Sequence, residues 1–331
     1  MTDSILKYDS EIIWSLPCFF QYQPVIGALS QTIRRIEPET KFKTQSYGAP
    51  VTVWSGEMMP DNYERLDDYT IDTFFEYYEE VDSTPVFTFT STNITPDDLG
   101  DEYANYILNK TMEYNCQYAV FSDDLKNHIK DKNPCAVVCA SHIKAIDKFQ
   151  AKNIPYEEET KFYNDLLKEY DFVYLRPEYV KNALLKDITL IDDLSRTVVT
   201  INSSCMANCK SCMSHLKVLE NFSKKPSRGE SVNCPLPFAY LRDLYDQNLT
   251  LTSDEIRLLF DKGVRVFKYD KEKEPSVYMD ILILKIASQL FNTDGANYML
   301  MNRTLSELLG AEIGYFKEKF AQSEYARKAF Q

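Results

Sequence analysis

Residues 157–185 read EEETKFYNDLLKEYDFVYLRPEYVKNALL and contain the unit that repeats along this chain. Glu157–Tyr170 has the length and apolar spacing of an amphipathic helix. Phe172–Leu175 is a short, continuously apolar run, which is what a strand buried on both faces requires. After a two-residue turn the helical spacing returns over Glu178–Leu185. The stretch therefore predicts a helix, a strand and a helix in succession.

The same alternation extends in both directions along the chain. The predicted strands are Glu11–Leu16, Val51–Ser55, Val86–Thr90, Tyr118–Ser122, Ala136–Ala140, Phe172–Leu175, Val198–Asn202 and Val264–Tyr269. The further predicted helices are Asn62–Val81, Asp97–Tyr114, Asp124–Lys130 and Ser276–Phe291. Repeated strand–helix alternation predicts an α/β fold, a (β/α)8 TIM-like barrel. The alternative is an open doubly wound sheet, which more often carries a glycine-rich phosphate loop after its first strand.

The domain division follows from where the strands stop. We expect residues 1–291 to form the barrel and residues 292–331 to form a C-terminal helical extension packed on it. Thr95, Ser122 and Thr252 each precede a predicted helix and supply a side-chain oxygen, so they are predicted N-caps.

Charge and hydropathy limit the class of partner. The formal net charge of the 331 residues is −13, which disfavours nucleic acid, because phosphate binding is driven by Lys and Arg. The opening residues show no secretory signal, and the longest apolar-looking run, Val277–Lys285, contains charges and is shorter than a membrane span. We therefore expect a cytoplasmic protein without a membrane partner, which binds a small-molecule substrate or a protein.

A cysteine cluster follows the seventh predicted strand. Cys205, Cys209 and Cys212 have C-x3-C-x2-C spacing, and Cys234 comes later. Thiolates at such spacing can hold a [4Fe–4S] cluster or a zinc ion. With His215 in place of Cys234 the set would suit zinc, and the remaining four cysteines are expected to be buried or idle thiols. The same spacing occurs in radical S-adenosylmethionine enzymes, although there the motif normally follows the first strand.

The loop also carries a family resemblance. A strand ending in Asn, a Cys-rich loop, a histidine and a further Cys resemble the collagenase-like peptidase superfamily of barrels. That superfamily includes iron–sulfur proteins of oxygen-independent ubiquinone hydroxylation and RNA-hydroxylation proteins. The closer likeness is to an uncharacterised branch from bacteria and phages. It rests on Tyr47–Pro50 with Trp54–Gly56, Leu175–Val180, Asn202–His215 and Gly263–Lys268.

The resemblance implies a metal-dependent, iron–sulfur barrel enzyme that performs oxygen-independent hydroxylation or a related modification of a small molecule. The chain departs from the branch where Ser55-Gly56-Glu57-Met58 replaces Asn-Gly-Gly-Arg and where Tyr269-Asp270 replaces Gly-Arg. Loss of these arginines leaves a second hypothesis open: a non-catalytic barrel with structural zinc that binds a protein.

In a barrel of this type, function resides in the loops that follow the strands. We expect Arg176 and Glu178 to hold a substrate carboxylate and a proton, and His142 to act as a general base. Lys268 lies near the end of the eighth predicted strand and faces either the barrel mouth or solvent. Three further features are predicted to be structural: Asp123-Asp124 at a helix start, His128 in a polar helix, and the solvated acidic turn Glu157-Glu158-Glu159.

Overall fold

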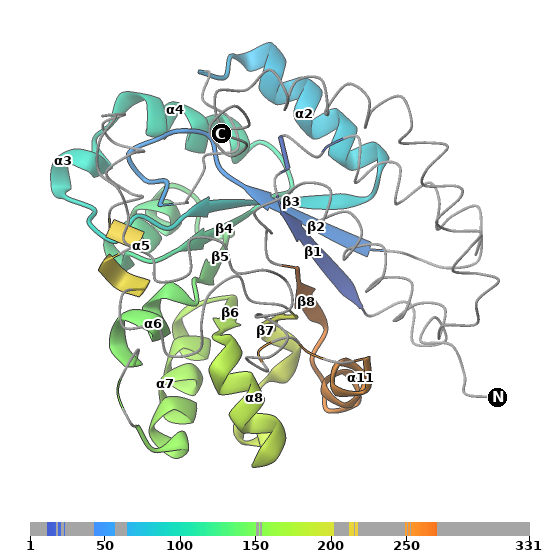
Figure 1. Ribbon diagram of the computed structural model, residues 1–331. Coiled ribbons are helices and arrows are strands. Elements are labelled where there is room, and N and C mark those ends of the chain that lie inside the picture. Colours follow the sequence, from blue (N-terminus) through green and yellow to red (C-terminus); the bar gives the residue numbers. More distant parts are fainter. Residues whose placement is uncertain are drawn as a thin grey trace, which may run out of the picture.

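The computed structural model describes residues 12–17, 19–20, 23, 43–56, 65–149, 152, 154–201, 212–214, 216–217, 249, 251 and 253–269. Eight parallel strands form a closed barrel in sequence order, and β8 returns to pair with β1 (Figure 1). The TIM-like fold class is therefore confirmed, and the open sheet is excluded. The strands are β1 (Ile13–Pro17), β2 (Lys43–Gly48), β3 (Ser83–Phe89), β4 (Gln117–Val120), β5 (Val137–Ala140), β6 (Phe172–Leu175), β7 (Thr197–Thr200) and β8 (Val266–Lys268).

Helices surround the strands (Figure 1). Because each helix returns the chain between parallel strands, its N-terminus lies near the barrel face where the preceding strand ends, here called the C-terminal face. The described helices are α2 (Asp68–Glu80), α3 (Pro96–Leu99), α4 (Glu102–Thr111), α5 (Asp123–Lys132), α6 (Ile143–Phe149), α7 (Tyr156–Glu169), α8 (Pro177–Leu185) and α11 (Ser253–Asp261), with short 3-10 turns η2 (Ile188–Leu190) and η3 (Leu194–Arg196).

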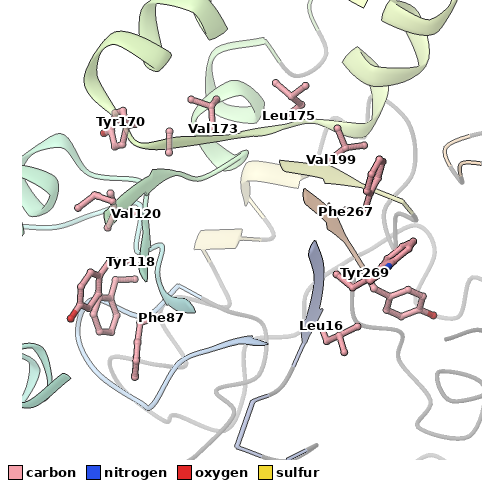
Figure 2. Packing of buried hydrophobic residues seen from close by; sticks show 14 of the residues in the cluster. Leu16, Phe87, Tyr118, Val120, Tyr170, Val173, Leu175, Val199, Phe267 and Tyr269 are labelled. Atoms are coloured by element: carbon pink, nitrogen blue, oxygen red, sulfur yellow. The ribbon is translucent and has the colours of Figure 1, made fainter. Parts of the chain in front are cut away.

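Strand residues alternate between two apolar layers, as the two-residue period of a strand requires. Tyr174 of β6 belongs to the cluster inside the barrel, together with Val86 and Val266. Its neighbours Val173 and Leu175 belong to the larger cluster between strands and helices, and Figure 2 shows both pointing away from the barrel axis. Burial on both faces explains why most strands are continuously apolar in sequence.

The second strand was predicted wrongly. Sequence placed it at Val51–Ser55, but the strand is Lys43–Gly48, and Val51–Ser55 is a turn beyond its end. Two polar side chains of β2 make hydrogen bonds to other strands. Gln45 donates to Gln117 of β4 at 3.2 Å, and the Ser46 hydroxyl lies 2.8 Å from that of Ser83. Because the buried side chains of this strand are polar and bind residues far away in the sequence, no apolar run marks the strand.

The turn that follows β2 packs tightly against the loop after β3. Trp54 is fully buried, its indole N–H donates to the Asp98 carbonyl at 2.7 Å, and its own carbonyl accepts from the Ser91 amide at 2.9 Å. A β-carbon at Gly56 would lie 2.5 Å from the carbonyl carbon of Thr90. The Trp-Ser-Gly motif is therefore explained by close backbone packing.

Helix starts follow the predicted capping chemistry where the structure describes them. Thr95 caps α3 in a reciprocal capping box with Asp98, and the Ser122 hydroxyl accepts from the Leu125 amide at the start of α5. The helix predicted over Asp97–Tyr114 is divided into α3 and α4 at Gly100, because Asp101 begins a second helix by capping it.

Two further predictions fall outside the described residues: the helix Ser276–Phe291 and the extension 292–331. Within the described residues, no helix is long and apolar enough to cross a membrane.

Candidate functional site

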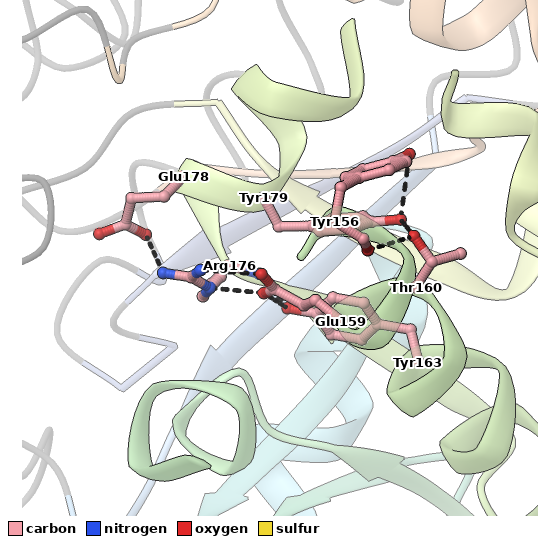
Figure 3. Close-up of polar contacts among 7 residues, drawn as sticks. All are labelled: Tyr156, Glu159, Thr160, Tyr163, Arg176, Glu178 and Tyr179. Carbon is pink, nitrogen blue, oxygen red and sulfur yellow. Dashed lines mark hydrogen bonds and ion pairs between the residues drawn. The ribbon is translucent and has the colours of Figure 1, made fainter. Parts of the chain in front are cut away.

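A buried ion pair lies at the C-terminal face between β6 and α8. Arg176 occupies the turn between these two elements, and Glu159 comes from the first turn of α7. Arg176 donates from Nε to Glu159 Oε1 at 2.5 Å and from Nη2 to Oε2 at 2.8 Å (Figure 3). Each side chain is only 6% exposed. The bidentate geometry fixes the plane of the guanidinium group.

Tyr163, one helical turn after Glu159, completes this arrangement. Its hydroxyl donates to Glu159 Oε1 at 3.2 Å and accepts from the backbone amide of Arg176 at 3.1 Å. Burial raises the pKa of Tyr163 well above its ordinary value, so the phenol remains a donor. Burial opposes the charge of Arg176, but the hydrogen bond and charge of Glu159 outweigh it and the pKa of Arg176 is raised.

The position of Glu159 corrects an expectation from the sequence. The acidic run was predicted to be a solvated first turn, and Glu157 and Glu158 are indeed exposed. Glu159 is buried instead, because it lies on the face of α7 that meets the end of β6, where Arg176 neutralises it.

Glu178 approaches the same arginine from the first turn of α8. Its Oε2 lies 3.8 Å from Arg176 Nη1, and its side chain is 12% exposed. Arg176 Nη1 is buried, and among the described residues it has no hydrogen-bond partner. The structure thus brings the predicted residues Arg176 and Glu178 together, while their role in a reaction stays a prediction.

A second polar chain fastens α7 to α8 beside this pair. The Thr160 hydroxyl lies 2.8 Å from that of Tyr179, and Tyr179 donates to Tyr156 at 3.3 Å. The rings of Tyr156 and Tyr179 stack with centroids 5.2 Å apart. These contacts (Figure 3) hold the helix starts that carry Glu159 and Glu178 in a fixed relation.

The other predicted site residues lie elsewhere on the same face. His142 follows β5, which neighbours β6, and its side chain is partly buried at the start of α6. Asp123 forms an ion pair with Lys144 at 2.9 Å and accepts a hydrogen bond from Tyr170, which agrees with a structural role. His128 is 2.8 Å from the side-chain oxygen of Asn105.

Lys268 lies inside the barrel mouth. It occupies the same face of β8 as the inward-facing Val266, it is buried, and its ammonium group lies 4.2 Å from the ring centre of Tyr47. Ser15 pairs laterally with both Lys268 and Gln45, so one polar layer spans β8, β1 and β2. The sequence alone left this orientation open, because the face depends on the barrel register.

Among the predicted metal ligands, the structure describes only Cys212. Cys212 is 9% exposed and packs against Ile146 of α6. Cys205, Cys209, Cys234 and the alternative ligand His215 lie outside the described residues. Within the described part of the chain no group of three potential metal ligands occurs, and the metal prediction stays a prediction.

Comparison with solved structures finds four similar chains. No protein-family model matches the chain, and no curated protein matches it. A solved structure described as "The Structure of the U32 Peptidase Mk0906" is similar over 83% of this chain and 96% of that chain, with 13% sequence identity and a TM-score of 0.48. No residue role follows from a likeness at this level. The bacterial and phage branch stays a prediction.

Proposed function

We propose that this protein holds a metal centre on the C-terminal face of its barrel through Cys205, Cys209, Cys212 and Cys234. A small molecule would bind on the same face, beside Arg176 and Glu178. The barrel architecture supports the choice of face, because ligands of such barrels bind where the strands end.

The observation that carries the proposal is the position of Cys212. β7 ends at Thr200 on the C-terminal face, and the chain is described again at Cys212, buried against Ile146 of α6. Because α6 begins just after β5, its N-terminus lies at this same face. A thiol shielded by apolar side chains suits a metal–thiolate bond, since exclusion of water protects it.

The donor set is compatible with two kinds of centre. Four thiolates hold either a [4Fe–4S] cluster or a zinc ion. The resemblance of the cysteine loop favours the iron–sulfur cluster, and we propose that centre. The resemblance implies oxygen-independent hydroxylation, and we propose that class of reaction for the cluster-loaded protein. A C–H bond of the small molecule would be replaced by C–OH, and a co-substrate that donates oxygen at a higher oxidation level would supply the oxygen atom and take up the two electrons.

The test is anaerobic purification of the full chain, followed by iron, zinc and acid-labile sulfide analysis and a visible spectrum. We expect a brown protein with iron and sulfide in near-equal amounts. Cys212→Ser and Cys234→Ser should each lose most of the metal, and His215→Ala should retain it. Cys135→Ser is the matched control, because Cys135 is exposed and outside the loop.

Each other result has a definite meaning. A colourless protein with one zinc ion would indicate a structural zinc site instead of a cluster, and it would favour the hypothesis of a non-catalytic barrel. Metal loss in His215→Ala but not in Cys234→Ser would move the fourth ligand to His215. Full metal content in Cys212→Ser would refute the proposed site.

A further inference from the structure

A cavity lies between the starts of α2 and α4, on the side of the barrel opposite Arg176. Its volume is about 670 Å³, which falls within the range of small-molecule sites, about 300–1,000 Å³. Figure 1 shows the two helices side by side; α2 follows β2 and α4 follows β3, whereas Arg176 follows β6. Because both helices begin near the C-terminal face, the cavity lies at the rim of that face. Its lining includes Arg65, Asp101, Glu102, Tyr103 and Tyr106.

Two tyrosines of α4 form an aromatic wall of this cavity. Tyr103 and Tyr106 lie one helical turn apart, and their rings are nearly parallel, at 19° with centroids 6.2 Å apart. The Tyr103 hydroxyl accepts from the Leu66 amide at 2.8 Å, and the Tyr106 hydroxyl donates to Asp68 Oδ1 at 2.6 Å. These hydrogen bonds join both rings to the start of α2, so the wall is held in place without a ligand.

The two phenol groups differ in the hydrogen bonds that they can still make. Tyr103 accepts, so its O–H is available to donate, whereas Tyr106 donates, so its oxygen is available to accept. Burial raises the pKa of both phenols, that of Tyr106 to about 12, so both stay neutral at physiological pH. One donor and one acceptor therefore accompany the apolar ring faces.

The charged side chains of the cavity add further donors and acceptors. Arg65 is exposed, its guanidinium carbon lies 4.8 Å from the ring centre of Tyr103, and it forms no ion pair with a described residue. Glu102 is exposed in the first turn of α4 and likewise has no ion pair in the described part of the chain. Asp101 uses one carboxylate oxygen to cap that helix. The guanidinium group of Arg65 and the carboxylate of Glu102 are therefore available to a ligand.

This mixture of groups selects a neutral ligand that is rich in hydroxyls. An anion would pair with Arg65 but would be repelled by two carboxylates, and a cation would be repelled by Arg65. A hydroxyl both donates and accepts, so neighbouring hydroxyls can bind a guanidinium and a carboxylate at once. A flat face of C–H groups packs on a tyrosine ring by dispersion. A pyranose ring with equatorial hydroxyls combines the two properties.

We propose that this cavity binds a pyranose sugar of glucose configuration: its C–H face packs on Tyr106, and its hydroxyls bind Arg65 and Glu102. Tyr106 receives the sugar because Arg65 already lies over the ring of Tyr103. The inference goes beyond the proposed function, because this site shares no residue with the proposed metal ligands or with the Arg176–Glu178 pair.

The experiment compares three neutral probes: methyl β-D-glucopyranoside, sorbitol and cytosine. Sorbitol has the hydroxyls without a ring face, and cytosine has a flat ring without hydroxyls. Binding to the full chain is measured by saturation-transfer NMR titration, and a crystal soaked with the glucoside locates the sugar. We expect the glucoside to bind about tenfold more tightly than either other probe, since an aromatic contact contributes on that scale.

Variants test the role of each group. Tyr106→Leu should weaken glucoside binding about tenfold, whereas Tyr106→Phe, which keeps the ring but also loses the hydrogen bond to Asp68, should retain most of it. Arg65→Ala should weaken binding severalfold, because the guanidinium donors are lost. Tyr69→Leu is the matched control: Tyr69 is an exposed tyrosine of α2 outside the cavity, and its loss should leave the affinity unchanged. Thermal unfolding checks that each variant is folded.

Four results would overturn the inference. They are no saturable binding of the glucoside, equal or tighter binding of sorbitol or cytosine, a soaked sugar located outside the cavity, and equal losses in Tyr106→Leu and Tyr106→Phe. Metal content is measured on the same preparation. Because the cavity residues are separate from the cysteine loop, failure here is distinguishable from failure of the metal proposal.

Discussion

Replacing Glu159 by Gln tests whether the Arg176–Glu159 pair is as important as its geometry indicates. The change keeps the side-chain size but removes the charge that neutralises a guanidinium group only 6% exposed. It also removes one of the two carboxylate oxygens that bind Arg176. Breaking a buried pair by removing one partner costs about 3–5 kcal/mol, and we expect the lower end, about 3 kcal/mol, because the amide oxygen still accepts.

The assay is unfolding by denaturant and by heat. A loss of about 3 kcal/mol is a large share of a typical total of about 5–15 kcal/mol. At roughly 2 °C per kcal/mol for a large domain, Tm should fall by about 6 °C. The denaturant midpoint should fall while its slope stays the same, because the surface exposed on unfolding is unchanged.

Two further variants separate the ion pair from general damage to α7. Glu157→Gln lies in the same turn but is exposed, so its effect should stay within about 0.5 kcal/mol. Combining Glu159→Leu with Arg176→Met should destabilise less than the sum of the two single changes, since no buried charge remains. A loss below about 1 kcal/mol in Glu159→Gln, or an equal loss in Glu157→Gln, would refute the reasoning.

Three other perturbations have expected outcomes. Gly56→Ala should lower the free energy of unfolding by about 1–3 kcal/mol or more in denaturant titrations, because its β-carbon would lie 2.5 Å from neighbouring backbone. Burial lowers the pKa of His128 below its ordinary 6.5, so the unfolded state binds the proton better. Unfolding titrations should show stability lost as pH falls below about 6.5, an effect that ceases below the folded-state pKa. In alkylation mapped by mass spectrometry, exposed Cys135 should react at pH 8 while Cys116, whose pKa burial raises to about 12, stays unmodified until unfolding.

Each of these has a matched control. Gly100→Ala should be tolerated, because the nearest atom to its added carbon is 3.4 Å away, and an equal loss at both glycines would contradict the packing argument. His128→Gln should reduce the change in the free energy of unfolding between about pH 7.5 and 5.5. If that change stays the same, groups other than His128 cause it. Modification of Cys116 in the folded protein would show that the segment just before β4 opens locally.

The sequence by itself determined the barrel and most of its strands. A strand covered on both faces is mostly apolar, so seven of the eight strands stand out as runs such as Phe172–Leu175. Local chemistry also settled the caps at Thr95 and Ser122, because a cap and the amide it binds lie three residues apart. Placing Arg176 and Glu178 at a strand end followed from the same alternation.

Tertiary structure alone decided the features that depend on distant partners. β2 is polar because Gln45 finds Gln117, 72 residues away. Glu159 is buried rather than solvated because Arg176, 17 residues on, neutralises it. Lys268 faces the barrel interior because closure sets the register of β8 against β1. A buried polar group is stable only if its partner arrives with correct geometry, and that depends on how the strands and helices assemble.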